Sequence, residues 1–274
     1  LRPPSSLEKA RAAVAEDPDD PDALARLALG LLSSGKKAEA MSTLVLARQK
    51  FPEAPGPRYL ELRLQLMQKK NEAAHKTVKG LIEDGHDGYA VRMKAADLAE
   101  MSKKRDQMRT HLMAAHELDP SQAEPLQALY DLSNKQKNEQ GKLWALRELA
   151  KLEQHDRQVY GLLMKALVKR GEWKDAVEVG ESSIYLDVMN PQTHYLYARA
   201  LARTGKHISA IFELNSAIKA NPKPAQAAKI YRMMAEGYRG LDRDDYAAKA
   251  EALAKRMQRR VRNKAKKQGP GVGL

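Results

Sequence analysis

The chain has 274 residues, no cysteine and a formal net charge of +13, because 48 lysines and arginines outnumber 35 aspartates and glutamates. The lack of cysteine excludes a disulfide framework, a thiolate metal site and a catalytic thiol. With 43% hydrophobic residues but only two Phe and two Trp, the composition favours closely packed helices, and the expected fold class is all-α.

Residues 1–20 are expected to contribute the second helix of a preceding partial repeat. Residues 5–18 have a helical pattern, with small Ala10 and Ala13 on the packed side and EDP at the end. The opening LRPPSSLEKA lacks the features of a signal peptide, and no apolar run approaches the roughly 18 residues of a membrane span. Because the array begins in mid-unit and the first residue is Leu, we expect a processed or excised piece of a longer protein, of undetermined compartment.

Residues 21–224 contain six consecutive units of 34 residues without an insertion. Steps of 34 residues back from Ala210 pass through Ala176, Lys142, Met108, Ala74 and Ala40. The corresponding turn positions are Gly35, Lys69, Lys103, Lys137, Gly171 and Gly205. Each unit is expected to be a helical hairpin whose helices approach to about 8 Å where side chains are small. It must stack on its neighbours to bury its remaining apolar face.

The seventh repeat, residues 225–267, departs from the strict count because Ala247 is shifted by three residues. Its second helix is expected to run from near Asp244 to about Lys267 as an extended basic capping helix, before a flexible tail at residues 268–274. No acidic residue follows Glu251, whereas eight cations do: Lys255, Arg256, Arg259, Arg260, Arg262, Lys264, Lys266 and Lys267.

The repeating unit resembles the tetratricopeptide repeat family. The resemblance rests on LALGLLSSGKKAEAMSTLVLARQKFP, LMKALVKRGEWKDAVEVGESSI and YLYARALARTGKHISAIFELNSAIKANP, and it covers nearly the whole chain. The units that begin at residues 55 and 123 depart from the pattern at Glu61 and Lys142. The resemblance implies an α-solenoid of about seven repeats, a right-handed superhelix whose concave surface binds a segment of another protein.

No catalytic or cofactor-binding motif is visible in the sequence. HExxH, GxGxxG, P-loop and GxSxG patterns are all missing, and GPGVGL at the end follows no strand. His111 and His116 are five residues apart, about 140° around a helix, which does not suit a shared metal ion. His194 and His207 are expected to have surface roles at a helix start and a turn. We therefore expect a chain without enzymatic activity, cofactor or metal.

The resemblance further implies that positions 2, 5, 9, 12 and 13 of each unit face the bound segment. In the C-terminal half these candidate groove residues are mostly basic: Lys165, Lys169, Tyr195, Arg199, Arg203, Arg232 and Arg239. In the N-terminal half the lining is mixed, with Tyr59, Arg63, Met67 and Met93 as candidate contacts. Lys165 and Arg199 are 34 residues apart and should lie side by side, as should Lys169 and Arg203. Such a ladder favours an acidic peptide, a C-terminal carboxylate or an anionic polymer.

Three functions remain open from the sequence. The leading hypothesis is a protein-interaction scaffold whose groove binds a partner segment with acidic groups. One alternative is an accessory region of a larger bacterial enzyme, such as a peptidase, or of a polysaccharide or protein secretion component. The other is association with nucleic acid through the basic tail, with a solubilising cap as the plainer interpretation. The tail contacts in that case are Arg256, Arg259, Arg260, Arg262 and Lys264. The oligomeric state is left open.

Overall fold

The computed structural model describes residues 6–153 and 155–267, and the side chains of this part up to residue 265. Within these residues the helices, in chain order, are α1 (Ser6–Glu16), α2 (Pro21–Ser33), α3 (Lys37–Lys50), α4 (Pro55–Met67), α5 (Asn71–Glu83), α6 (Tyr89–Met101), α7 (Arg105–Leu118), α8 (Glu124–Lys135), α9 (Glu139–Leu152), α10 (Arg157–Arg170), α11 (Trp173–Leu186), α12 (Pro191–Arg203), α13 (His207–Lys219), α14 (Pro224–Arg239) and α15 (Asp244–Lys267). The expected all-α class and its helix-turn-helix units are confirmed. The proposed flexible tail at 268–274, including GPGVGL, lies outside the described residues.

The turns inside six hairpins share one backbone conformation. The residues at these turns have positive φ angles: Gly35 (77°), Lys69 (56°), Lys103 (55°), Lys137 (56°), Gly171 (77°) and Gly205 (79°). These positions follow one another at intervals of 34 residues. A left-handed residue ends the first helix and directs the chain into the second. Glycine has no Cβ to oppose this conformation, whereas the three lysines adopt it at a steric cost.

Small residues lie where the paired helices cross. Ala198 on α12 and Ala217 on α13 are both fully buried, and Ala210 is 1% exposed. The same positions of the first hairpin, Ala28 and Ala40, are buried to the same degree. Alanine therefore permits the close helix approach that larger side chains would prevent.

The two positions that depart from the repeat pattern are accommodated by ion pairs. Glu61 on α4 accepts a hydrogen bond of 3.0 Å from Nε of Arg48 on α3. Lys142 on α9 lies 3.5 Å from Glu139, one helical turn earlier. Each charged side chain thus reaches a partner at the partly exposed edge of its hairpin, and the units keep their helical form.

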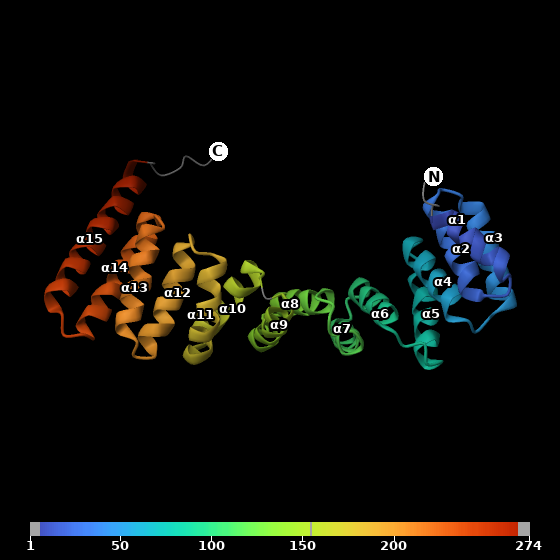
Figure 1. Cartoon of the computed structure of the whole chain (residues 1–274), viewed down its shortest axis with the longest axis horizontal. Helices are drawn as coiled ribbons and strands as arrows, with labels where there is room; N and C mark the ends of the chain where they lie inside the picture. Colours follow the sequence, from blue (N-terminus) through green and yellow to red (C-terminus); the bar gives the residue numbers. More distant parts are fainter. Residues whose placement is uncertain (1–5, 154, 268–274) are drawn as a thin grey trace. The chain divides into compact units, whose positions relative to one another are not determined.

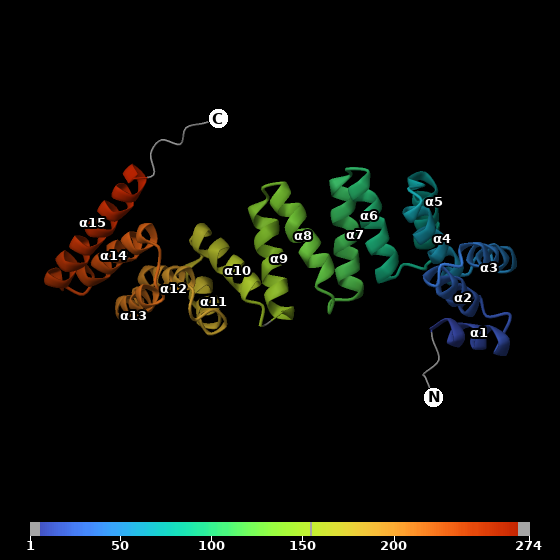
Figure 2. The ribbon, with the colours of Figure 1, turned by 90° about the horizontal axis from the view of Figure 1, so that it is seen from above.

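The chain divides into two compact units, one ending at Leu132 and the other beginning at Ser133, within α8. In the N-terminal unit α2 packs on α3, α4 on α5 and α6 on α7. In the C-terminal unit the consecutive helices α10 to α15 pack in order, and they lie side by side in Figures 1 and 2. Direct contacts also join α10 to α12 and α12 to α14, so the first helices of three successive hairpins form one continuous surface.

Candidate functional site

The surface formed by α10, α12 and α14 contains a hollow of about 670 Å³. Four of the predicted groove residues, Lys165, Lys169, Tyr195 and Arg199, line it together. The other lining residues are Val168, Gln192, Leu196, Lys223, Ala225, Gln226 and Lys229. The structure therefore brings equivalent positions of neighbouring repeats to one place, where basic and apolar residues line the same hollow.

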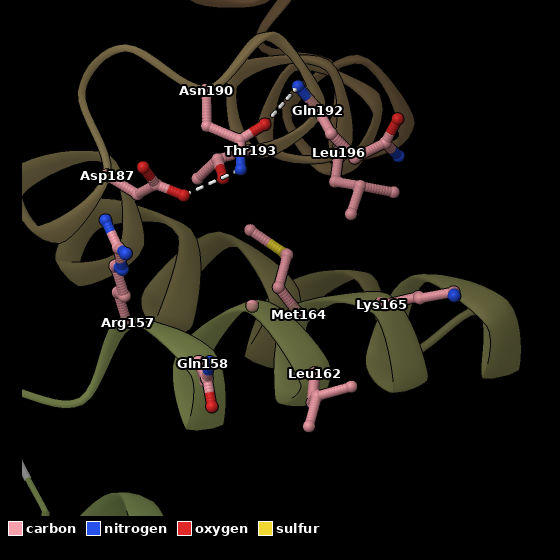
Figure 3. Close-up of a pocket in the computed structure, with 11 residues that line it drawn as sticks. Arg157, Gln158, Leu162, Met164, Lys165, Asp187, Asn190, Gln192, Thr193 and Leu196 are labelled. Atoms are coloured by element: carbon pink, nitrogen blue, oxygen red, sulfur yellow. Dashed lines mark hydrogen bonds between the residues drawn. The ribbon is translucent and has the colours of Figure 1, made fainter.

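A second hollow of about 620 Å³ adjoins the first between α10 and α12 and shares Lys165, Gln192 and Leu196 with it. In Figure 3 Met164 points from α10 toward α12, where its side chain is fully buried. The loop at this end is ordered by Asn190, which donates to Asp187 at 2.6 Å and accepts from the backbone N–H of Gln192 at 2.9 Å. This side-chain cap satisfies an N–H group at the start of α12.

A third hollow of about 590 Å³ lies between α14 and α15 and shares Ala225 and Lys229 with the first. Its remaining lining residues are Ala228, Arg232, Lys255, Gln258, Arg259, Val261 and Arg262. Because consecutive hollows share residues, the three form one feature, called here the C-terminal groove. It runs along α10, α12 and α14 to α15.

The cations of the first hollow are largely without acidic partners. Lys165, Lys223 and Lys229 form no ion pair with a carboxylate in the described part of the chain. Lys169 differs, since its Nζ lies 3.1 Å from Glu139, and its hydrogen bond holds the pKa of the Glu139 carboxyl below its usual range. The first turn of α14 has no acidic residue either, so its N-terminal N–H groups add to the positive potential.

Arg199 and Arg203 both contact Trp173, the first residue of α11. Their guanidinium carbons lie 5.6 Å and 5.7 Å from a ring centroid of the indole. The ring face attracts both cations and restricts their side chains. Arg199 also lines the first hollow, whereas Arg203 lines none of the three hollows. Lys169 and Arg203, which were expected to lie side by side, therefore do not line a common hollow.

The other predicted basic residues have different surroundings. Arg232 lines the third hollow, but Arg239 lies outside the groove lining and pairs with Glu251 on α15. Among the tail residues, Arg259 and Arg262 line the third hollow. Those exposed on α15 outside that lining are Arg256, Arg260 and Lys264.

The four candidates in the N-terminal unit differ in accessibility. Met93 is only 8% exposed, so the interpretation of this side chain as a groove contact is wrong for the described structure; it is a core residue of α6. Tyr59 is partly buried against the cluster that contains Leu62, whereas Arg63 and Met67 are exposed. A hollow of about 360 Å³ between α1 and α2 includes none of these four residues in its lining.

Several groove residues were missed in the sequence. Lys229 follows Tyr195 by 34 residues, and Gln226 follows Gln192 by the same interval, so the repeat count contained a signal for both. Lys223 lies in the loop before α14 and has no such signal.

The expectation of a surface role for His194 is also wrong. Its side chain is 8% exposed, and its Nδ1 lies 2.7 Å from a Glu213 oxygen while its Nε2 lies 2.8 Å from the carbonyl of Val188. The pair joins α12 to α13 inside the hairpin. In the part of the chain with described side chains, His, Asp and Glu residues form no group of three that could hold a metal ion. None of the helices described is both long and apolar enough to cross a membrane.

No family model and no curated protein matches the sequence. Among solved structures, the chain is similar to one chain in a structure of Naa15 and Naa10 bound to HypK. The identity is 18%, the match covers 86% of this chain and 36% of that chain, and the TM-score is 0.64. The chain is also similar to MamA, with 18% identity, coverage of 68% and 97%, and a TM-score of 0.50. A tetratricopeptide repeat protein from Parabacteroides merdae gives 15% identity, coverage of 86% and 93%, and a TM-score of 0.45. At these identities the similarity concerns the fold alone, which is that of a tetratricopeptide-like solenoid.

Proposed function

We propose that the chain is a non-catalytic scaffold whose C-terminal groove holds an extended, acidic segment of a partner protein. One observation supports this proposal above the others: Lys165, Arg199, Lys223 and Lys229, from three successive hairpins and a loop, surround one hollow that no carboxylate lines. The neighbour in which Naa15 and Naa10 are bound to HypK is an example of a related fold in a protein complex.

The charge of the hollow favours an acidic ligand. Two unit charges about 4 Å apart repel each other by roughly 1 kcal/mol in water and by more near a protein surface. Cations gathered around one hollow therefore raise the energy of the free protein, and ligand carboxylates relieve this repulsion. Lys169 shows the same preference within the chain, since it pairs with Glu139 at the edge of the hollow.

The remaining lining favours a polypeptide. Ala225 provides exposed apolar surface for side chains, while Val168 and Leu196 line the hollow from the core and are only 3% and 8% exposed. The amides of Gln192 and Gln226 offer both donors and acceptors, which suit the alternating N–H and C=O groups of an extended backbone. Acidic groups would then give orientation, and apolar side chains would give contact area.

Charge reversal tests the proposal. A fluorescein-labelled peptide of alternating Glu and Leu is titrated with the full chain, and anisotropy is measured at several salt concentrations. Lys165→Glu with Arg199→Glu should weaken binding by at least about tenfold, equivalent to roughly 1.4 kcal/mol, and should reduce the salt dependence.

The matched control is Lys174→Glu with Lys219→Glu, which makes the same charge change at exposed positions on α11 and α13. Its affinity should stay within about threefold of the unmodified chain, because distant surface charges are screened at physiological salt. Equal losses in the two double variants would show attraction to net charge alone and would refute the proposed site.

A further inference from the structure

Six basic residues of α15 form two rows with different surroundings. Lys255, Arg259 and Arg262 line the hollow between α14 and α15. Since residues three and four apart share a face of a helix, these three form one row. The second row, outside the lining of that hollow, consists of Arg256, Arg260 and Lys264.

The first row faces a matching set on α14. Lys229 and Arg232 line the same hollow, and α14 and α15 lie side by side along it (Figure 1). No carboxylate lines the hollow, and none of its five cations forms an ion pair with a carboxylate in the described part of the chain. The ion pair that does join the two helices, between Arg239 and Glu251, lies outside that lining.

The surface between these cations is apolar and contains no aromatic ring. Ala225, Ala228 and Val261 line it. Proteins that bind single-stranded nucleic acids stack the bases on aromatic side chains, and no aromatic side chain lines this hollow. A polypeptide with acidic and small apolar side chains has the complementary chemistry.

Lys229 and Ala225 belong to both this hollow and the first one. From this continuity we propose that one partner segment carries two acidic clusters, the first bound along α10, α12 and α14 and the second between α14 and α15. The inner row of α15 is then a wall of the binding groove, beyond any solubilising effect of the helix. This inference rests on the proposed function, because it extends the same groove.

Two linked clusters bind more tightly than one, because the second cluster binds at a high effective concentration once the first is held. Two labelled peptides separate the cases. One has a single block of alternating Glu and Leu, and the other has two such blocks joined by a Gly-Ser spacer, prepared with several spacer lengths. With the unmodified full chain, the best two-block peptide should bind at least about tenfold more tightly than the one-block peptide.

Two triple variants remove the same charge from different rows of α15. In the inner variant Lys255, Arg259 and Arg262 are replaced by Gln, and in the outer variant Arg256, Arg260 and Lys264 are replaced by Gln. The inner variant should lose the advantage of the two-block peptide and keep one-block affinity within about threefold, whereas the outer variant should keep both affinities within that range. Circular dichroism and thermal unfolding confirm that both variants remain folded, which exposed Gln substitutions in a helix permit.

The possible failures are distinguishable. Equal losses in the inner and outer variants, or no two-block advantage in the unmodified chain, would overturn the inference while leaving the effect of Lys165→Glu with Arg199→Glu intact. Tighter binding of a single-stranded RNA oligonucleotide than of the two-block peptide, lost only in the inner variant, would overturn the assignment of the partner as a polypeptide. If the double reversal has no effect on the one-block peptide, the proposed function itself fails.

Discussion

Gln226 on α14 donates a hydrogen bond of 3.2 Å from its side-chain amide to the side-chain oxygen of Gln192 on α12, 34 residues earlier in the chain. The same position in two successive repeats is thus in direct contact on the wall of the groove. A sequence interval becomes a spatial neighbour relationship in this way, and the groove residues of one hairpin predict those of the next.

The two arginines on Trp173 should differ in their effect on peptide binding. Arg199→Gln should weaken binding of the one-block peptide by about 1 kcal/mol. This guanidinium lines the hollow, and the variant loses its charged hydrogen bond to the peptide. Arg203→Gln should change the affinity by less than about twofold, because this guanidinium contacts the indole but lines none of the three hollows.

Tryptophan fluorescence gives a second measurement. Trp144→Phe leaves Trp173 as the only tryptophan, and the emission of Trp173 should change on peptide addition.

Anisotropy titrations of the two single variants make the comparison. The emission change should persist in Arg203→Gln and decrease in Arg199→Gln. A larger loss of affinity for Arg203→Gln than for Arg199→Gln would contradict the placement of Arg199 in the hollow.

The left-handed turn residues predict stability changes of opposite sign. Lys137→Gly should raise the free energy of unfolding by about 0.5–1 kcal/mol, because glycine adopts this turn without the steric cost of a Cβ. This value is net of the opposing effect, the greater conformational entropy of glycine in the unfolded chain. Gly205→Ala should lower it by about 1 kcal/mol through backbone conformation alone, since nothing lies within 4 Å of the added Cβ. Urea unfolding followed by circular dichroism measures both, and a destabilised Lys137→Gly variant would contradict the assignment.

Two helical glycines in the C-terminal unit provide a second pair. A Cβ at Gly180 would lie 2.6 Å from Cε of Met164 and would overlap the ring of Tyr197, so Gly180→Ala should destabilise the unit by about 1–3 kcal/mol. A Cβ at Gly161 meets nothing within 4 Å, and Gly161→Ala should stabilise α10 by roughly 0.5–1 kcal/mol through helix propensity. Thermal unfolding of the two variants distinguishes packing from propensity; equal effects would refute the close contact of α11 with α12.

His111 on α7 should titrate below its ordinary range. Burial lowers the pKa of its imidazole from 6.5, and the neighbouring guanidinium of Arg92, 3.2 Å from Nδ1, lowers that pKa further. The unfolded chain binds the proton of this imidazole more readily than the folded chain does. The contribution of neutral His111 to the free energy of unfolding is therefore fully present above about pH 6.5 and is lost as pH falls through the pKa of the folded state. An NMR titration of the imidazole resonances measures this pKa.

Arg92→Gln serves as the comparison for His111. Removing the cation should move the pKa of His111 part of the way back toward 6.5, while the effect of burial remains. An unchanged pKa in this variant would contradict the role of Arg92.

The sequence predicted the fold because its main constraint is local and periodic. Small residues such as Ala198 and Ala210 recur at fixed intervals, and the helices pack around them in the structure. The candidate groove positions of Lys165 and Arg199 came from the tetratricopeptide resemblance, and the 34-residue count placed the two residues side by side; both line the first hollow. Periodicity does not determine how much of a side chain at a helix surface is buried, and Met93, only 8% exposed, was misassigned for that reason.

Two other features depend on contacts that no interval specifies. His194 can be buried because its two ring nitrogens form hydrogen bonds with Glu213 and with the carbonyl of Val188. The division of the α15 cations into two rows depends on how α15 packs on α14, and the irregular seventh repeat gives no guide to that packing.

The lysines at the left-handed turns have a consequence for proteolysis. Lys69, Lys103 and Lys137 are exposed, and each stands between the two helices of its hairpin. Trypsin, which cleaves after lysine, therefore finds cleavage sites at regular intervals of one repeat. A cut at such a turn separates a hairpin into its two helices. Cuts at all three turns would release residues 70–103 and 104–137, and each of these two fragments joins the second helix of one repeat to the first helix of the next.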